Sequence, residues 1–285
     1  MYLLGPSIEQ RLSARILALA LLMFATFLQL AFGQEPTARL MDQAPFDVLT
    51  LDKANDSKVC KITPVRLPGR KVPENPKRTD KLRIKLLEND QEYDVAWANI
   101  SKLELYEQLV VADVNKLTAD GKLDDAYEEL SFLLAYYPQS PGLAEARQNY
   151  LYVSSAAAFR QQKFDEALAL LEELAVLNFN FRPNENAAPL TQRLGDIADR
   201  LIGQYFQKKD YLAARGLLTR LITQYKAENE PFAKKWRQQL EDLATRFRDE
   251  ARQNLDSRKF VEAQDAASQL QNIWPQTSGP SRPRN

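Results

Sequence analysis

A pattern of twenty residues occurs four times in this chain of 285 residues, with copies that begin at positions 121, 162, 209 and 258. The sixth residue of each copy is alanine and the thirteenth is leucine: Ala126, Ala167, Ala214 and Ala263, then Leu133, Leu174, Leu221 and Leu270. Positions six, ten and thirteen are four and three residues apart, so they share one face of a helix. An alanine in that face allows a second helix to approach closely. The bulky third residue is expected to fill the turn before the helix.

A second amphipathic segment precedes each copy, at residues 106–120, 147–161, 194–208 and 236–257. Each copy therefore predicts a hairpin of two helices, and the chain is predicted to be mainly α from residue 99 to 275. The four hairpins are expected at about 106–140, 147–181, 190–228 and 233–275. An ordinary helical bundle with chance alanines is the alternative, but the common register of four copies favours repeats. Prolines and loops interrupt any long heptad run, which argues against a coiled coil.

The first copy resembles the tetratricopeptide repeat. It reads GKLDDA at 121–126, and Pro138 follows twelve residues after Ala126, as in the signature of that family. The other copies lack the glycine, and the second and third also lack the proline. The alanines are 41, 47 and 49 residues apart, against about 34 in the family. The resemblance is therefore to a divergent member with longer helices or loops.

This resemblance implies a concave binding surface lined by the first helix of each hairpin, and no catalytic activity. The residues expected to face a protein or peptide partner there are Gln108, Val111, Asn115, Asn149, Tyr152, Ala156, Arg160, Gln207, Arg248 and Arg252. The set is mostly neutral and ends in a basic pair, which suits an extended peptide better than a charged polymer. The carboxylate clamp of chaperone-binding repeats is not matched, because only Asn115 is suitably placed.

Residues 46–98 are predicted to form a separate small β domain. Alternation of apolar and polar residues with period two marks the clearer strands, and four segments have strand character: 46–51, 60–67, 81–88 and 93–97. In the second segment the apolar phase slips at Pro64, which predicts a bulge or a sheet edge. We expect an antiparallel meander, in the form of an SH3-like barrel, with residues 68–80 as a solvated loop. The acidic stretch 88–94 lacks the glycine and the later glutamate of a calcium loop, so it is expected to be a hairpin turn.

The N-terminus has the order of a secretory signal. Arg11 and Arg15 precede the uncharged apolar run 16–32, which is followed by Gly33. Residues 1–33 are therefore predicted to be a cleaved signal peptide and 34–45 a linker, which would make the protein periplasmic or extracellular. The alternative is that residues 16–32 remain as a membrane anchor. Apart from that segment, no membrane contact is expected.

The composition excludes several functional classes. Thirty-eight basic residues balance 38 acidic ones, which argues against a nucleic-acid binder that would need a basic excess. The absence of histidine excludes His-based triads, dyads and zinc motifs. Cys60 is the only cysteine, so it cannot form an intrachain disulfide, and we expect it to be a buried apolar residue. The scattered glycines form no phosphate-binding loop. No catalytic, metal-binding or cofactor-binding residue is therefore predicted.

Over its whole length the chain is similar to the N-terminal part of certain long bacterial envelope proteins. The similarity rests on YDVAW at 93–97 and LYEQLVVAD at 105–113, which are followed by the repeats. In those proteins an extracellular solute-binding domain of the peptide-binding type follows. Two functions are therefore expected: a non-enzymatic exported scaffold that binds another envelope protein or, as the alternative, the accessory front part of a solute-binding transport protein whose ligand domain is absent.

The C-terminal end carries a further expectation. Residues 276–285 contain no large apolar side chain and are predicted to be a disordered tail. The last helix is expected to have a face that no further helix covers, and this face comprises Ala263, Ala267, Leu270 and Ile273. On that basis we expect truncation, a frameshift near Pro275 or a partner that docks there, and self-association of the mature chain through this end. The alternative is that Trp274 folds back over part of the face.

Overall fold

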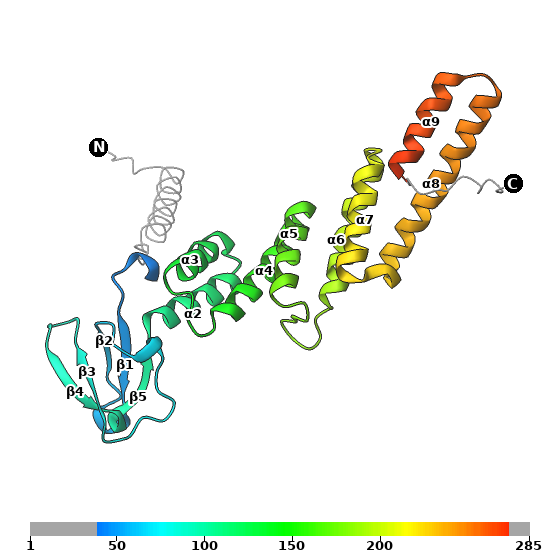
Figure 1. Cartoon of the computed structure of the whole chain (residues 1–285). Helices are drawn as coiled ribbons and strands as arrows, with labels where there is room; N and C mark the ends of the chain where they lie inside the picture. Colours follow the sequence, from blue (N-terminus) through cyan, green and yellow to red (C-terminus); the bar gives the residue numbers. More distant parts are fainter. Residues whose placement is uncertain (1–38, 274–285) are drawn as a thin grey trace, which may run out of the picture.

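The computed structural model describes residues 39–273. The predicted signal peptide, residues 34–38 of the predicted linker and the predicted tail lie outside these described residues. The described chain is mainly helical, and two small antiparallel sheets precede the helices. Figure 1 shows an elongated molecule, with the sheets at one end and the hairpins in a row that ends at α9.

The β part contains five strands among the described residues: β1 (Asp47–Leu51), β2 (Val59–Ile62), β3 (Lys81–Lys85), β4 (Glu92–Ala96) and β5 (Ile100–Glu104). The strand order is β2-β1-β5 in one sheet, and β3 and β4 form a separate hairpin. A single bridge between Ile62 and Leu86 connects the two sheets. The four predicted strands are present with shorter or shifted bounds, and β2 ends before Pro64 because proline cannot donate to a ladder.

Two expectations about this part need correction. The strand β5 was not predicted; it pairs antiparallel with β1, so the sheets are not a simple meander and extend beyond residue 98. Cys60 is only half-buried, at the margin of the β core. The acidic stretch 88–94 does contain the turn between β3 and β4, as expected. Short 3-10 helices occur at η1 (Leu40–Asp42), η2 (Lys53–Asn55), η3 (Pro68–Arg70), η4 (Trp97–Asn99) and η5 (Ala227–Asn229).

Eight α-helices follow in the described part, and they form four hairpins. The first helices of the hairpins are α2 (Tyr106–Ala119), α4 (Leu143–Arg160), α6 (Leu190–Gln207) and α8 (Pro231–Asp256). The second helices are α3 (Leu123–Tyr136), α5 (Phe164–Leu177), α7 (Tyr211–Tyr225) and α9 (Phe260–Ile273). Each second helix begins at the bulky third residue of its sequence copy.

The same turn joins the two helices of every hairpin. The first residue of each copy has a left-handed backbone, with φ of 75° at Gly121, 62° at Gln162, 58° at Lys209 and 60° at Arg258. The next N–H then donates to a carbonyl five residues earlier, as from Lys122 to Leu117 at 2.9 Å, which is the long bond of a Schellman motif. The left-handed conformation costs a non-glycine residue about 1–2 kcal/mol. The turn therefore recurs although only the first copy has the glycine.

The repeated alanines lie where helices meet. Ala126, Ala167 and Ala214 have no exposed surface, and Ala263 is 8% exposed. The hydroxyl of Ser155 on α4 donates to the carbonyl of Ala167 on α5 at 3.1 Å, which shows how closely the paired helices approach. Of the repeated leucines, the first three are buried and Leu270 is half-buried: Leu133, Leu174, Leu221 and Leu270.

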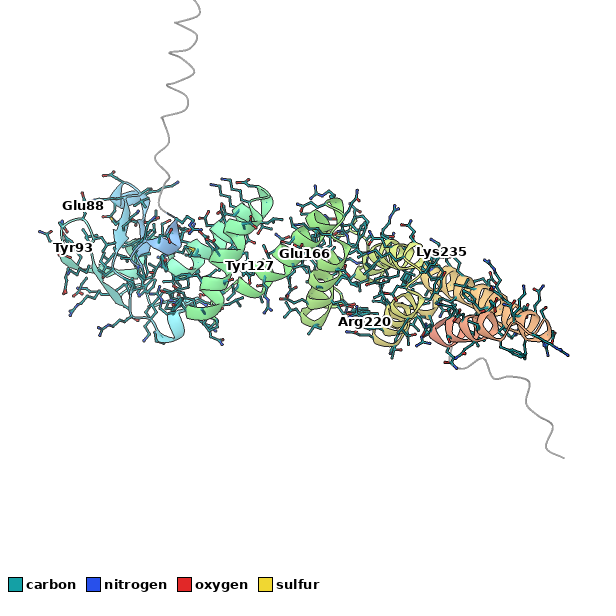
Figure 2. The ribbon with its side chains drawn as sticks, turned by 90° about the horizontal axis from the view of Figure 1, so that it is seen from above. Glu88, Tyr93, Tyr127, Glu166, Arg220 and Lys235 are labelled. Atoms are coloured by element: carbon teal, nitrogen blue, oxygen red, sulfur yellow. The ribbon has the colours of Figure 1, made fainter. Side chains whose placement is uncertain are left out.

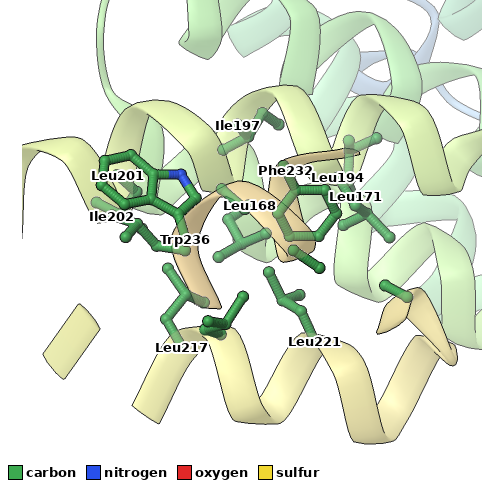
Figure 3. Packing of buried hydrophobic residues seen from close by; sticks show 14 of the residues in the cluster. Leu168, Leu171, Leu194, Ile197, Leu201, Ile202, Leu217, Leu221, Phe232 and Trp236 are labelled. Carbon is green, nitrogen blue, oxygen red and sulfur yellow. The ribbon is translucent and has the colours of Figure 1, made fainter. Parts of the chain in front are cut away.

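The apolar side chains form three clusters. One lies within the β part, one joins Phe46 to α2, α3 and the start of α4, and the largest runs from Leu151 to Ile273. Figure 3 shows the largest cluster where α5, α6, α7 and α8 meet, with Leu168 and Phe232 near its centre. Full burial of each such side chain stabilises the fold by about 1.5–3 kcal/mol.

The last helix is not left open as the sequence suggested. Helix α9 packs against α8 and α7. Ala263 and Ile273 are buried and Leu270 is half-buried, so only Ala267 of that predicted face is exposed. The face expected to lack a successor is therefore largely covered by α7 and α8. The exposed apolar residues of this hairpin lie instead at its turn: Leu255, Phe260 and Val261.

A buried ion network fixes the β part against the helices. Arg70 of η3 donates to Asp47 of β1 at 2.7 and 3.0 Å and to Glu107 of α2 at 2.7 and 3.0 Å. Asp47 is fully buried and also accepts from the N–H groups of Val65 and Tyr106, at 2.7 and 2.9 Å. Residues 68–80 are mostly exposed, but the prediction of a purely solvated loop was wrong at Arg70.

Candidate binding groove on the first helices

A hollow runs across the first helices of the second, third and fourth hairpins. It consists of three adjoining cavities of about 440, 840 and 730 Å³. Phe159, near the end of α4, lines all three, while the other walls come from α6, the start of α8 and residues 188–189. The helices α4, α6 and α8 therefore present a continuous concave surface.

The floor of the hollow is apolar. Leu171 of α5 and Ile197 of α6 are buried beneath the cavity that also contains Phe159 and Ala156. Gly195 and Gly203 of α6 face Phe232 and Trp236 of α8, so α8 can pack closely along this wall of the hollow. An apolar side chain of a ligand could lie against this floor and lose its contact with water.

Basic side chains surround the floor. Arg193 of α6 lies over the ring of Tyr152, with its guanidinium carbon 4.1 Å from the ring centroid. Arg160 donates to the carbonyl of Ala156 in its own helix at 3.2 Å. Neither Arg160 nor Arg200 has an ion pair within residues 39–273. Both arginines of the hollow thus lack a salt bridge in the described residues, although the charge of Arg200 lowers the pKa of Asp196 on the same helix.

Two acidic groups of the hollow, Asp199 and Asp196, have partners or are partly desolvated, and Glu230 is a third acid in the lining. One carboxylate oxygen of Asp199 accepts from Lys235 Nζ at 2.7 Å and from Trp236 Nε1 at 2.8 Å. Burial raises the pKa of Asp196, and the charge of Arg193 opposes that shift. Asp199 thereby orients Lys235 and Trp236 along the wall, and the charge left for a ligand is positive.

Three of the ten residues predicted to face a partner line this hollow: Ala156, Arg160 and Gln207. Two others are packing residues, because Val111 and Tyr152 are only 6% and 8% exposed. The side chain of Gln108 accepts from the N–H of Leu105 at 3.3 Å and closes the start of α2. The remaining four lie outside the three cavities: Asn115, Asn149, Arg248 and Arg252.

Sequence reasoning missed several residues of the hollow, namely Phe159, Arg193, Asp196, Asp199, Arg200, Lys235 and Trp236. A usable signal existed for two of them. Asp196 and Arg200 precede the predicted Gln207 by eleven and seven residues, which places all three on one helix face. Phe159 carried no such signal, since apolar residues near a turn are ordinarily part of the core.

The residues that line the hollow offer a surface for binding. Within residues 39–273 no group of three or more Cys, Asp or Glu side chains could hold a metal ion. None of the helices in the same described range combines the length and apolarity needed to cross a membrane. A scan against protein-family models matches none to this chain, and a search of curated proteins returns no relative.

Proposed function

We propose that this chain is a non-enzymatic, exported scaffold that binds an extended segment of another envelope protein. The architecture we propose is a TPR-like solenoid preceded by an SH3-like barrel. The four equivalent turns and the buried alanine of each hairpin support the repeat assignment. Export rests on the order of residues in the N-terminal segment.

The observation that carries the proposal is the continuous hollow on α4, α6 and α8. Packed helices lie about 8–10 Å apart, so three of them span about 20 Å. An extended peptide advances about 3.3 Å per residue, which corresponds to roughly six residues across the hollow. A globular metabolite would fill one cavity, whereas an extended chain would use all three.

The lining indicates the chemistry of the bound segment. An apolar side chain fits the floor formed by Phe159, Leu171 and Ile197. A carboxylate on either side of it would pair with Arg160 or Arg200, which have no ion pair of their own in the described chain. The proposed ligand is therefore a short extended peptide with an apolar anchor and flanking acidic residues.

Selection of displayed random heptapeptides against the purified full chain tests this proposal. The selected peptides should share one apolar position with an acidic residue nearby. Arg160→Glu and Arg200→Glu should each weaken their binding about tenfold. Arg252→Glu is the matched control, because Arg252 is an exposed arginine on α8 outside the hollow. Equal loss in all three variants, or no enrichment of peptides, would contradict the proposal.

A further inference from the structure

A separate cleft lies in the β part, between β3 and residues 63–67. Its volume is about 910 Å³, and its walls include Thr63, Val65, Leu82, Ile84 and Trp97. Figure 2 shows Glu88 and Tyr93, which border the β3–β4 turn, at the opposite end of the described array from Lys235. The cleft is thus distinct from the hollow on α4, α6 and α8.

The path of the chain at Pro64 explains why this cleft is open. Just before it, Thr63 N–H donates to the carbonyl of Lys85 at 2.9 Å, and Leu87 N–H donates to the carbonyl of Lys61 at 3.1 Å. Pro64 has no N–H to continue this ladder. Val65 N–H turns away and donates to Asp47 instead. The two segments therefore begin as a pair and then separate.

The separation leaves one edge of β3 without a neighbour. Within the described residues β3 pairs with β4 over its whole length, and Ile62–Leu86 is the further bridge at its end. Backbone groups of successive residues in a strand point to opposite sides. Because the Lys85 carbonyl points toward the cleft side, the N–H and C=O groups of Arg83 and Lys81 also face that side. The side chains between them, Leu82 and Ile84, are buried in the β core.

The surroundings of this edge are strongly basic. Residues 61–85 contain nine basic and two acidic residues, although the whole chain is electrically balanced. Around the cleft, Arg83 pairs with Asp94 at 3.1 Å and Lys85 with Asp90 at 2.9 Å. Arg66 and Lys81 have no ion pair within the described chain. The acidic groups in the lining are Asp80 and Glu92.

We propose that an extended acidic segment of a partner protein adds to the edge of β3 as a further strand. Its main chain would bond to Lys81 and Arg83, and its carboxylates would face Arg66 and Lys81. An open edge is a template for strand addition, which draws its affinity from main-chain hydrogen bonds. The basic side chains repel a second copy of the same edge and favour an acidic strand. A nucleic acid has no peptide backbone with which to complete the ladder.

Binding of designed peptides to the full chain tests this site. The probe is a fluorescein-labelled octapeptide of alternating Glu and Val, and the matched control alternates Lys and Val. We expect the acidic peptide to bind at least about tenfold more tightly than the basic one. In a chain that also carries Arg160→Glu and Arg200→Glu, which weaken binding to the hollow, the double variant Arg66→Glu, Lys81→Glu should abolish that preference. The heptapeptides selected for the helical hollow should still bind a chain that carries only this double variant, which separates the two proposals.

A backbone variant distinguishes strand addition from simple charge attraction. Arg83→Pro removes the N–H that faces the cleft and leaves the β4 side of the ladder intact, whereas Arg83→Ala removes only the charge. We expect Arg83→Pro to weaken binding of the acidic peptide at least about threefold more than Arg83→Ala does. In the unmodified chain, the acidic peptide should slow hydrogen exchange at the Lys81 and Arg83 amides, which requires no variant to fold.

Several results would overturn the proposal. One is unchanged exchange at both amides in the presence of saturating acidic peptide. Another is equal binding of an acidic octapeptide with alternate N-methylated residues, since that peptide cannot complete a ladder. A third is tighter binding of an oligothymidylate than of the acidic peptide. The last is concentration-dependent self-association that the acidic peptide does not compete with.

Discussion

Gly195 of α6 lies directly against the ring of Phe232 of α8, so a methyl group on Gly195 would be 2.7 Å from Cδ1 of that ring. A distance of 2.7 Å between two carbon atoms that are not bonded is shorter than an unstrained structure allows. Both residues are buried, and Phe232 belongs to the largest apolar cluster. The absence of a side chain at Gly195 therefore sets how closely α6 and α8 pack along one wall of the hollow.

Gly195→Ala should destabilise the protein by about 1–3 kcal/mol, because the new methyl group must displace a packed ring. Gly203→Ala is the matched control on the same helix. There the nearest atoms, in the Trp236 ring, would be 3.7 Å away, and the gain in helix propensity should stabilise by about 0.5–1 kcal/mol. Urea denaturation of both variants measures the difference. Equal effects would mean that α8 can shift freely against α6.

Ala167→Leu should destabilise the second hairpin by about 1–3 kcal/mol, because Ala167 has no exposed surface and lies against α4. Ala169→Leu provides the control, since Ala169 is exposed on the same helix and should change stability by less than about 0.5 kcal/mol. The comparison is made by urea denaturation at one pH. A similar cost at both positions would contradict the close helix contact that the repeat requires.

Arg70→Met should cost about 3–5 kcal/mol, because it leaves the carboxylates of Asp47 and Glu107 buried without their cation. Arg70→Lys should restore only part of the loss, since an ammonium group cannot make the five hydrogen bonds of the guanidinium. Arg66→Met, an exposed arginine nearby, should be nearly neutral. Thermal unfolding followed by circular dichroism checks the order Arg70→Met, Arg70→Lys, Arg66→Met from least to most stable.

The helical part was predictable because its signals are periodic and local. The spacing of Ala126, Leu130 and Leu133 identifies a helix face, and its recurrence identifies the hairpins. The turns are harder to predict, because Gln162, Lys209 and Arg258 adopt a left-handed φ at positions where the sequence has no glycine to indicate it. Their equivalence became visible only in the backbone hydrogen bonds that each turn makes.

The sites were less predictable because they depend on contacts between distant segments. Arg70 belongs to a stretch rich in proline and charge, and nothing local distinguishes it from its exposed neighbours. Its role follows from Asp47 and Glu107, which are 23 and 37 residues away. In the same way, the hollow unites Phe159, Arg200 and Lys235 only after the first helices have packed side by side.

Glu129 of α3 is a buried acid that lies near a second acid, Asp113 of α2. It has no exposed surface, and neither carboxylate oxygen accepts a hydrogen bond. Burial, followed by the charge of Asp113, raises the pKa of Glu129 to about 7, and the charge of Arg39 opposes this shift. The reference pKa of the side chain is 4.5. The folded protein therefore binds a proton more tightly at this position than the unfolded chain does.

This difference predicts how stability depends on pH. Between about pH 4.5 and 7 the unfolded state releases the Glu129 proton first, so the free energy of unfolding should fall as the pH rises, and the loss should be complete above pH 7. Glu129→Gln removes the titrating group and should be more stable than the unmodified chain at pH 8 by about 1–3 kcal/mol, with a much smaller difference at pH 4.5. Glu145→Gln, at an exposed position on α4, should show no such pH-dependent gain. Urea midpoints of the three proteins at both pH values check this, and an equal gain of Glu129→Gln at the two pH values would show that Glu129 does not titrate between them.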